Sequence, residues 1–158
     1  PPVVRCMPNT PALYGHGATG VYASDAVTAK QRASVSNVLN AVSEVVCWVD
    51  TEDQIDAVTA VSGSGPAYFF LVLEAMQEAG VKAGLSREVA AQLAAQTCLG
   101  AAHMALKSSD SFGELRRKVT SPNGTTHAAI THMEQGGMPA CIRGALRAAA
   151  ARSAELGE

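Results

Sequence analysis

The sequence predicts a mainly α-helical protein in which a short α/β segment precedes a helical domain. Residues 1–50 alternate between short β-type runs and one amphipathic helical run, whereas the pattern from Thr51 onward is almost entirely helical. Hydrophobic residues make up 47% of the chain and aromatic residues only 4%, which favours small apolar side chains packed between helices. We therefore expect a remnant α/β segment at 1–50 and a helical domain at 51–158.

The first fifty residues contain three β-type runs and one helix. The β-type runs lie at 3–7, 18–24 and 44–49, and the amphipathic helical run lies at 27–42. This β, β, α, β order is typical of the end of an α/β unit, but it provides too few strands for a complete sheet.

Six helices are expected in the remainder of the chain. Their ranges are about 52–61, 65–80, 86–107, 111–119, 125–135 and 138–155. Thr51 with Gln54, and Ser111 with Glu114, have the spacing of a capping box, in which the hydroxyl and the later side chain each accept a backbone N–H.

The helix that begins at Pro66 is apolar around nearly its whole circumference. A helix without a polar face must be covered on all sides, so we expect a partner chain to supply part of the cover. Its most apolar run, 67–76, is shorter than the roughly 20 residues that cross a bilayer, so no membrane span is expected. In the next helix, small residues such as Ala90 and Ala94 either allow close helix approach or simply favour the helix, and both interpretations stay open.

Charge and cysteine spacing argue against several classes of protein. The formal net charge of −2 and the absence of a basic stripe argue against nucleic-acid binding. The cysteines are too far apart for a zinc or disulfide framework, so we expect buried thiols in a reducing cytoplasm; they are Cys6, Cys47, Cys98 and Cys141. His127 and His132 are five residues apart and do not share a helix face, so no metal site is expected. No signal-peptide pattern opens the sequence, and the expected location is cytoplasmic.

The segment SGSGPAY at 62–68 resembles part of a dinucleotide-binding loop. The GxGxxG pattern would need glycine at position 68, where Tyr68 stands, and a helical pattern precedes the segment in place of a strand. We interpret it as a break between helices, with Pro66 in the first turn and a glycine surface that allows close approach to the backbone.

The segment SPNGTT at 121–126 places hydroxyls and backbone N–H groups at a helix N-terminus. Gly124, the N–H groups of Thr125 and Thr126, and the Ser121 hydroxyl together suit a small carboxylate or phosphate. The alternative is a plain N-cap in which Ser121 or Thr125 satisfies the helix's own backbone, which is far commoner than ligand binding. From these residues alone, both interpretations stay open.

Several segments together resemble the Δ1-pyrroline-5-carboxylate reductase family. They occur in the family's order and spacing from about residue 3 to the C-terminus and read VRCMPNTPALYGHGATGVYA, IDAVTAVSGSGPAYFF, GVKAGL, AAQTCLGAAHM and VTSPNGTTHAAITHMEQGG. The resemblance implies a helical dimerisation domain of the 6-phosphogluconate dehydrogenase C-terminal type, preceded by the end of a Rossmann domain. It favours ligand binding over a plain N-cap at residues 121–126.

The resemblance also implies an activity, which is the reduction of 1-pyrroline-5-carboxylate to L-proline by hydride transfer from NADPH or NADH. The family's glycine-rich cofactor loop is absent from this sequence, so the chain looks like the C-terminal part of such an enzyme and is expected to be inactive by itself. Family members form intertwined homodimers, which commonly join into decamers. The remaining alternatives are a non-catalytic dimerisation module from a truncated gene and a related imine or β-hydroxyacid reductase.

Site residues follow from the resemblance by position. The substrate carboxylate is expected on the N–H groups of Gly124 and Thr125 and on the Ser121 hydroxyl, and the Thr126 hydroxyl is expected at the ring nitrogen as the catalytic group. Val119 and residues 63–66 would form the apolar wall of the pocket. Met7, Pro8 and Asn9 match a loop that lies along the nicotinamide end of the cofactor.

Two residues depart from the family's loop, which usually reads Ser-Pro-Gly-Gly. Asn123 replaces a glycine, and asparagine tolerates left-handed backbone angles better than most residues, so the loop is expected to keep its shape. His127 replaces a usually apolar residue and is expected either over the pocket or in solvent.

Overall fold

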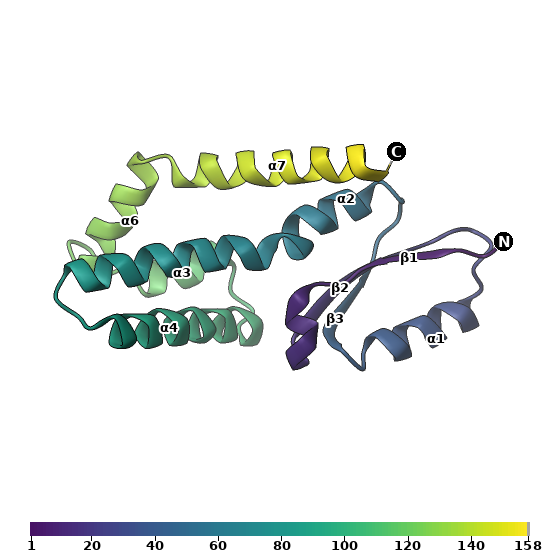
Figure 1. The fold of residues 1–158 in the computed structure, drawn as a ribbon, viewed down its shortest axis with the longest axis horizontal. Coiled ribbons are helices and arrows are strands. Elements are labelled where there is room, and N and C mark those ends of the chain that lie inside the picture. The colour runs from purple at the N-terminus through teal and green to yellow at the C-terminus, as the bar shows by residue number, and fades with distance from the viewer. Residues whose placement is uncertain (158) are drawn as a thin grey trace. The chain divides into compact units, whose positions relative to one another are not determined.

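The computed structural model describes residues 1–157 of the chain. Its elements in order are β1 (Val4–Met7), η1 (Thr10–Tyr14), β2 (Gly17–Ala23), α1 (Ala29–Leu39), β3 (Ser43–Trp48), α2 (Gln54–Val58), η2 (Thr59–Gly63), α3 (Gly65–Lys82), α4 (Arg87–Lys107), α5 (Phe112–Lys118), α6 (Thr125–Gln135) and α7 (Met138–Gly157). The predicted class, mainly α-helical with a preceding α/β segment, is confirmed (Figure 1).

By compactness the chain divides into two units. The first unit comprises Pro1–Tyr68 together with the last part of the chain from Ile142, and the second unit comprises Phe69–Cys141. The first unit holds the sheet, and the second unit is entirely helical.

The first unit is built on a sheet with the strand order β1-β2-β3. Strand β2 is antiparallel to β1 and parallel to β3, and its residue Val21 is fully buried. Gly20 pairs with Cys47, and Val21 pairs with Trp48. Because successive side chains of a strand point to opposite faces, Gly20 and Cys47 share one face of the sheet, and Val21 and Trp48 share the other.

Helix α1 covers the face that carries Trp48. The Trp48 indole Nε1 donates a hydrogen bond of 3.1 Å to Ser36 Oγ, and the Arg32 guanidinium lies 5.0 Å from the centre of the indole ring. The helix begins with a complete capping box between Thr28 and Gln31, which the sequence analysis did not predict.

Helix α2 packs on the opposite face because Gly20 has no side chain. A Cβ placed on Gly20 would lie 2.4 Å from Val58 Cγ1, which is closer than real carbon atoms approach. The absence of that atom lets α2 approach the sheet, and Ile55 on the same helix is only 2% exposed. This glycine is therefore required by packing, since its φ does not lie in the left-handed region.

Between α2 and α3 the chain makes one π-helical turn, η2. The Ser64 N–H donates to the Thr59 carbonyl oxygen at 2.8 Å, and the Tyr68 hydroxyl donates to the Ala60 carbonyl oxygen at 3.1 Å. A Cβ on Gly63 would lie 2.5 Å from Met7 Cε. The absence of a side chain at Gly63 therefore leaves room for the Met7 side chain to pack there. The predicted close approach to the backbone is confirmed at Gly63, whereas the predicted break is instead a π-helical turn within a long helical stretch.

Elements α2, η2 and α3 form one long helical stretch, Gln54–Lys82. By length and composition it could cross a membrane, with a mean hydropathy of 1.2 in its most apolar window and 17% of that window buried. The helix extends beyond both ends of the run 67–76, whose length alone predicted no membrane span. A helix that packs against another chain has the same composition, so this finding alone is weak support for a membrane span.

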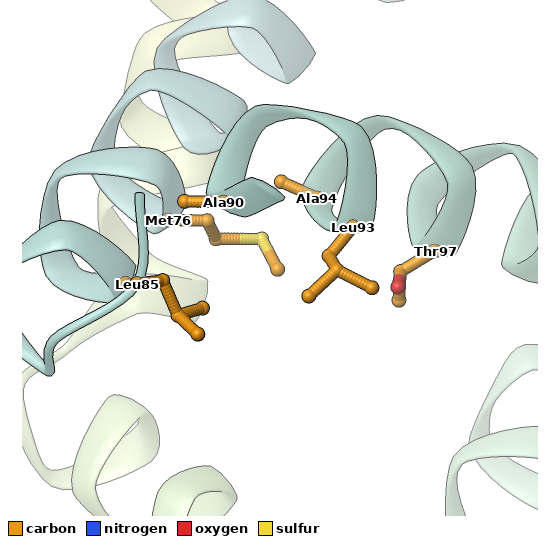
Figure 2. A pocket seen from close by; sticks show the side chains of 7 residues that line it. Met76, Leu85, Ala90, Leu93, Ala94 and Thr97 are labelled. Carbon is orange, nitrogen blue, oxygen red and sulfur yellow. The ribbon is translucent and has the colours of Figure 1, made fainter. Parts of the chain in front are cut away.

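In the second unit, α3 and α4 approach closely through small residues. A Cβ on Gly80 would lie 3.0 Å from Ala90 Cβ, and Ala90 and Ala94 are buried. Close helix approach is thus confirmed at these positions, whereas nothing lies within 4 Å of a Cβ on Gly100. An open apolar hollow of about 140 Å³ remains beside this contact, and Figure 2 shows Met76, Leu85 and Leu93 around it.

One predicted capping box is present and the other is wrong. The Ser111 hydroxyl accepts the Glu114 N–H, and the Glu114 carboxylate accepts the Ser111 N–H. At the start of α2, Gln54 Oε1 accepts the N–H groups of Asp50 and Thr51. The reciprocal bond is missing because the Gln54 N–H donates to the Thr51 carbonyl oxygen and not to its hydroxyl.

A single chain leaves much apolar side-chain surface uncovered. Phe69, Phe70 and Leu71 at the start of α3 are 61%, 65% and 67% exposed. The expectation of buried thiols is wrong for the same reason: the cysteines are free, but Cys98 is half-buried and the rest are exposed. This exposure agrees with the predicted need for a partner chain.

Replacing Gly20 with alanine should test the packing of α2 on the sheet. We expect Gly20→Ala to lower the free energy of unfolding by about 1–3 kcal/mol because the new methyl group overlaps Val58. Urea unfolding followed by the fluorescence of Trp48, the chain's one tryptophan, measures this change. In the Gly20→Ala/Val58→Ala double variant the two losses should be less than additive, and strict additivity would contradict the proposed contact.

Candidate functional site

The candidate site is the turn between α5 and α6. The Gly124 N–H donates to the Ser121 carbonyl oxygen at 3.1 Å, which closes a four-residue turn with Pro122 and Asn123 at its centre. Asn123 has a φ of 60°, the one positive value among the described non-glycine residues. Proline followed by a residue with positive φ is the pattern of a type II turn. Asn123 thus adopts the left-handed conformation that asparagine was expected to tolerate.

The first turn of α6 has unpaired backbone donors. The helix begins after Gly124, whose carbonyl oxygen accepts the Ala128 N–H at 3.1 Å. Within residues 1–157, no side chain caps this helix, and the N–H groups of Thr125 and Thr126 make no hydrogen bond. The plain N-cap interpretation is therefore wrong, because neither Ser121 nor Thr125 satisfies the helix's own backbone. What remains is a positive helix end with free donors.

The Gly124 N–H is not among those free donors. It donates to the Ser121 carbonyl oxygen, so the expectation that the Gly124 N–H binds a ligand is corrected. The free N–H groups are those of Thr125 and Thr126. Gly124 serves the site differently: a Cβ there would lie 3.2 Å from the Ser121 carbonyl oxygen and 3.6 Å from Ser121 Cβ. Its missing side chain lets Ser121 lie beside the helix start.

The predicted substrate residues of this turn are accessible. Ser121, Thr125 and Thr126 are exposed, and in the described part of the chain their hydroxyls make no hydrogen bond. Val119, which ends α5, is 55% exposed. The structure therefore brings together three hydroxyls and two free N–H groups within one turn.

The basic side chains that precede the turn are mostly committed to carboxylates. Lys118 Nζ forms an ion pair with Asp110, and hydrogen bonds from Lys118 and Ser108 hold the pKa of the Asp110 carboxyl below its ordinary value. Arg116 pairs with Glu134 at 3.1 Å. The free helix end is thus the group in this turn that is available to attract an anion.

Glu114 at the start of α5 is held ionised by its capping box. The pKa of its carboxyl is lowered by hydrogen bonds from the Ser111 backbone N–H and hydroxyl. This cap fixes the first turn of the short helix that leads into the candidate site.

His127 lies beside the turn and lines a hollow that Pro122 of the turn also lines. The side chain is exposed and contributes to an open hollow of about 390 Å³ with Arg116, Arg117 and Thr120 from the neighbouring segment. Its expected position, over the pocket or in solvent, is thus resolved as an exposed side chain at the rim of this hollow. In the described residues, no group of three metal-ligating side chains is present.

The predicted cofactor loop, Met7 to Asn9, lies in the first unit after β1. Asn9 Nδ2 donates to the Ser62 carbonyl oxygen at 3.2 Å, and Asn9 Oδ1 accepts the Ala18 N–H at 2.9 Å. Pro8 is exposed, and Met7 packs against Gly63. The structure thus joins this loop to η2, and Asn9 holds the backbone in place.

The segment Gly15 to Gly20 reads GxGxxG, but its structure is not that of a dinucleotide loop. It leads into strand β2, whereas a dinucleotide loop leads from a strand into a helix. A Cβ on Gly17 would lie 2.6 Å from the Val42 carbonyl oxygen, so this glycine is needed for sheet packing. The glycines of residues 62–65 are likewise part of η2 and α3.

A comparison with protein families agrees with this geometry. Residues 52–156 match the family model described as pyrroline-5-carboxylate reductase dimerisation. The chain belongs to the pyrroline-5-carboxylate reductase family. The matched range includes α2, η2 and the candidate site in α6.

Named relatives of the family cover nearly the whole chain. It is 59% identical to a pyrroline-5-carboxylate reductase of Pseudomonas aeruginosa, across 99% of this chain and 57% of the relative. It is 45% identical to one of Mycobacterium tuberculosis, across 98% of this chain and 58% of the relative. The chain therefore spans less than two thirds of the length of these pyrroline-5-carboxylate reductases.

Solved structures of the family have the same fold. The Coxiella burnetii pyrroline-5-carboxylate reductase is 47% identical with a TM-score of 0.94, across 98% of this chain and 57% of that chain. The Plasmodium falciparum pyrroline carboxylate reductase, solved with NADP bound, is 32% identical with a TM-score of 0.90 and matches 99% of this chain and 62% of that chain.

Asn123 offers a test of the turn in this pyrroline-5-carboxylate reductase family member. We expect Asn123→Ala to lower the free energy of unfolding by about 1 kcal/mol, because alanine is strained at positive φ. The matched control Asn123→Gly should be neutral or stabilising, since glycine has no such strain. Chemical unfolding of both variants measures the difference, and equal stabilities would contradict the left-handed conformation.

Proposed function

We propose that this chain is the substrate-binding and dimer-forming part of a cytoplasmic pyrroline-5-carboxylate reductase, which reduces the imine of 1-pyrroline-5-carboxylate to L-proline with NADPH or NADH. Family membership supports the reaction class. The observation that carries the proposal is the uncapped start of α6, where the N–H groups of Thr125 and Thr126 are free beside the Ser121 hydroxyl.

The substrate carboxylate binds at this helix end. Its oxygens accept the N–H groups of Thr125 and Thr126 and the hydroxyl of Ser121. Hydrogen bonds to a charged group contribute about 1.5–3 kcal/mol each, and the positive end of the helix dipole adds to them. The Gly124 amide contributes only if the turn opens, because its N–H is already bonded to Ser121.

The Thr126 hydroxyl acts on the ring nitrogen. A carboxylate fixed on the adjacent N–H groups places the five-membered ring next to the exposed side chain of Thr126. Reduction converts an imine nitrogen into an amine, and a hydroxyl is able both to donate to and to accept from that nitrogen as its charge changes. Val119, which follows α5 and is 55% exposed, offers an apolar surface beside the turn that orients the ring.

The cofactor supplies the hydride, and this chain contributes only part of its binding site. Met7 and Pro8 provide an apolar edge for the nicotinamide end, and Asn9 stabilises their loop through its bonds to Ala18 and Ser62. Among the described residues, the glycine-rich segments 15–20 and 62–65 lead into strand β2 and helix α3 and do not form the strand–loop–helix unit that cradles a diphosphate. We therefore place the phosphate-binding loop in a Rossmann domain encoded upstream, with a domain boundary near residue 50.

The chain alone is proposed to be inactive as a reductase. Its matched range carries the description of a dimerisation region, which favours a second function as a helical dimerisation module. In the complete enzyme this module forms a homodimer, and dimers join into a decamer. Turnover of pyrroline-5-carboxylate with NADPH by the 158-residue chain alone would contradict the assigned inactivity.

The role of Thr126 is tested in the full-length enzyme. Thr126→Ala should lower kcat by about 10²-fold, because the group that meets the ring nitrogen is lost, whereas Thr126→Ser should retain most activity. Steady-state kinetics with pyrroline-5-carboxylate measures both variants. An unchanged kcat in Thr126→Ala would remove this hydroxyl from the mechanism, and a preference for another cyclic imine or a β-hydroxyacid would favour a related reductase.

The role of Ser121 is separable from that of Thr126. Ser121→Ala should raise KM for pyrroline-5-carboxylate about tenfold with little change in kcat, since a contact to the unreacting carboxylate binds ground state and transition state alike. Thr120→Ala is the matched control. The Thr120 hydroxyl donates to the Arg116 carbonyl oxygen, so it is not free to bind the substrate carboxylate. If KM is unchanged in Ser121→Ala, the carboxylate does not bind this hydroxyl.

A further inference from the structure

The first unit contains an apolar hollow of about 400 Å³ between the sheet and the helical segment α2–η2, which we call the β3 hollow. It lies on the face of β3 that is turned away from α1. Its lining residues are Ala18, Thr19, Gly20, Val45, Cys47, Val49, Gln54, Ala57, Val58, Val61 and Ser62. None of these side chains is charged.

The hollow exists because α2 covers only part of this face. The contact between Gly20 and Val58 draws the helix over β2. The alternate residues Val45, Cys47 and Val49 of the neighbouring strand segment line the remaining space. Val45 is 43% exposed and Cys47 is exposed, although the other face of the same strand is covered by α1 through Trp48.

The helical wall of the hollow is equally uncovered. Val61, in the π-helical turn, is 62% exposed although it faces an apolar space. Two exposed valines and an exposed thiol around one hollow form a continuous apolar surface, which is typical of an interface.

The family comparison connects this hollow to dimer formation. The range matched by the dimerisation model begins at residue 52, so α2 and η2, which form the helical wall, lie inside it. The strand wall lies outside it, since β3 ends at Trp48. One wall of the hollow thus lies inside the range that matches the dimerisation model, and the other wall lies in the α/β segment.

We propose that a second copy of this chain fills the β3 hollow through an apolar helical surface, so that the dimer interface extends from the helical region onto strand β3. The inference rests on the dimer in the proposed function and adds the α/β segment to its interface. A symmetric dimer has two such contacts, because each copy offers the same hollow to the other. The uncharged lining excludes a partner that binds mainly by charge.

Charged substitutions in the hollow test the proposal. Val61→Asp and Val45→Asp should each raise the dimer dissociation constant of the chain at least about tenfold, because a carboxylate would be buried in an apolar contact. The matched control is Val38→Asp on α1, where the valine is 70% exposed and does not line the hollow. It should leave the constant within about twofold, as surface substitutions usually do. Sedimentation equilibrium measures the constants, and circular dichroism with Trp48 fluorescence verifies folding.

Cys47 provides a second measurement that needs no substitution. In the wild-type chain, labelling of Cys47 by N-ethylmaleimide should be lost at concentrations at which the chain is dimeric and should return on dilution to the monomer. Peptide mass spectrometry measures the labelled fraction. Labelling at the same rate in dimer and monomer would overturn the proposal.

Three further outcomes test this inference and the proposed function separately. A wild-type dimer that is unaffected by Val61→Asp and Val45→Asp would overturn the hollow as an interface and leave the enzyme assignment intact. Protection of Cys47 in the full-length protein that persists on dilution to the monomer would also overturn it, because upstream residues of the same chain would then fill the hollow. Loss of the Thr126 effect on kcat would overturn only the reductase mechanism.

Discussion

The site depends on one backbone constraint, the type II turn that joins α5 to α6. The turn uses the Gly124 N–H internally, and it enters α6 through a residue with no side chain to cap the helix. The N–H groups of Thr125 and Thr126 are therefore left free at the positive end of a helix. A capping serine or aspartate at position 124 would accept the N–H of Thr126 or His127 and would compete with an anion at this helix end. Glycine at this position therefore leaves the donors of the first turn without a side-chain acceptor.

The second constraint is that a single chain cannot cover its own apolar surface. Charged residues are only 16% of the sequence, and apolar side chains in α3 and α4 remain exposed in one copy. The hollow beside these helices is lined mainly by apolar side chains. Residues 52–156, which match the dimerisation model, include both these exposed helices and the uncapped start of α6.

Local patterns allowed most elements to be predicted. The helical spacing of apolar residues located the helices, and Ser111 with Glu114 correctly predicted the start of α5. The same spacing at Thr51 and Gln54 was misleading, because the Thr51 carbonyl oxygen took the N–H that its hydroxyl was expected to accept. The π-helical turn had no clear signal, since it depends on a tertiary contact of Gly63 with Met7 and on the Tyr68 hydroxyl.

The helical class and the left-handed residue in the turn at Asn123 could be predicted from local sequence, because both depend on the conformational preferences of neighbouring residues. The free amides of that turn and the glycines that are packing contacts became evident only in the folded chain. A hydrogen bond such as that from Gly124 to Ser121 competes with every other acceptor nearby, and the approach of Val58 to Gly20 joins residues far apart in the chain. Neither outcome can be read from spacing, because it is a property of distances in the folded protein.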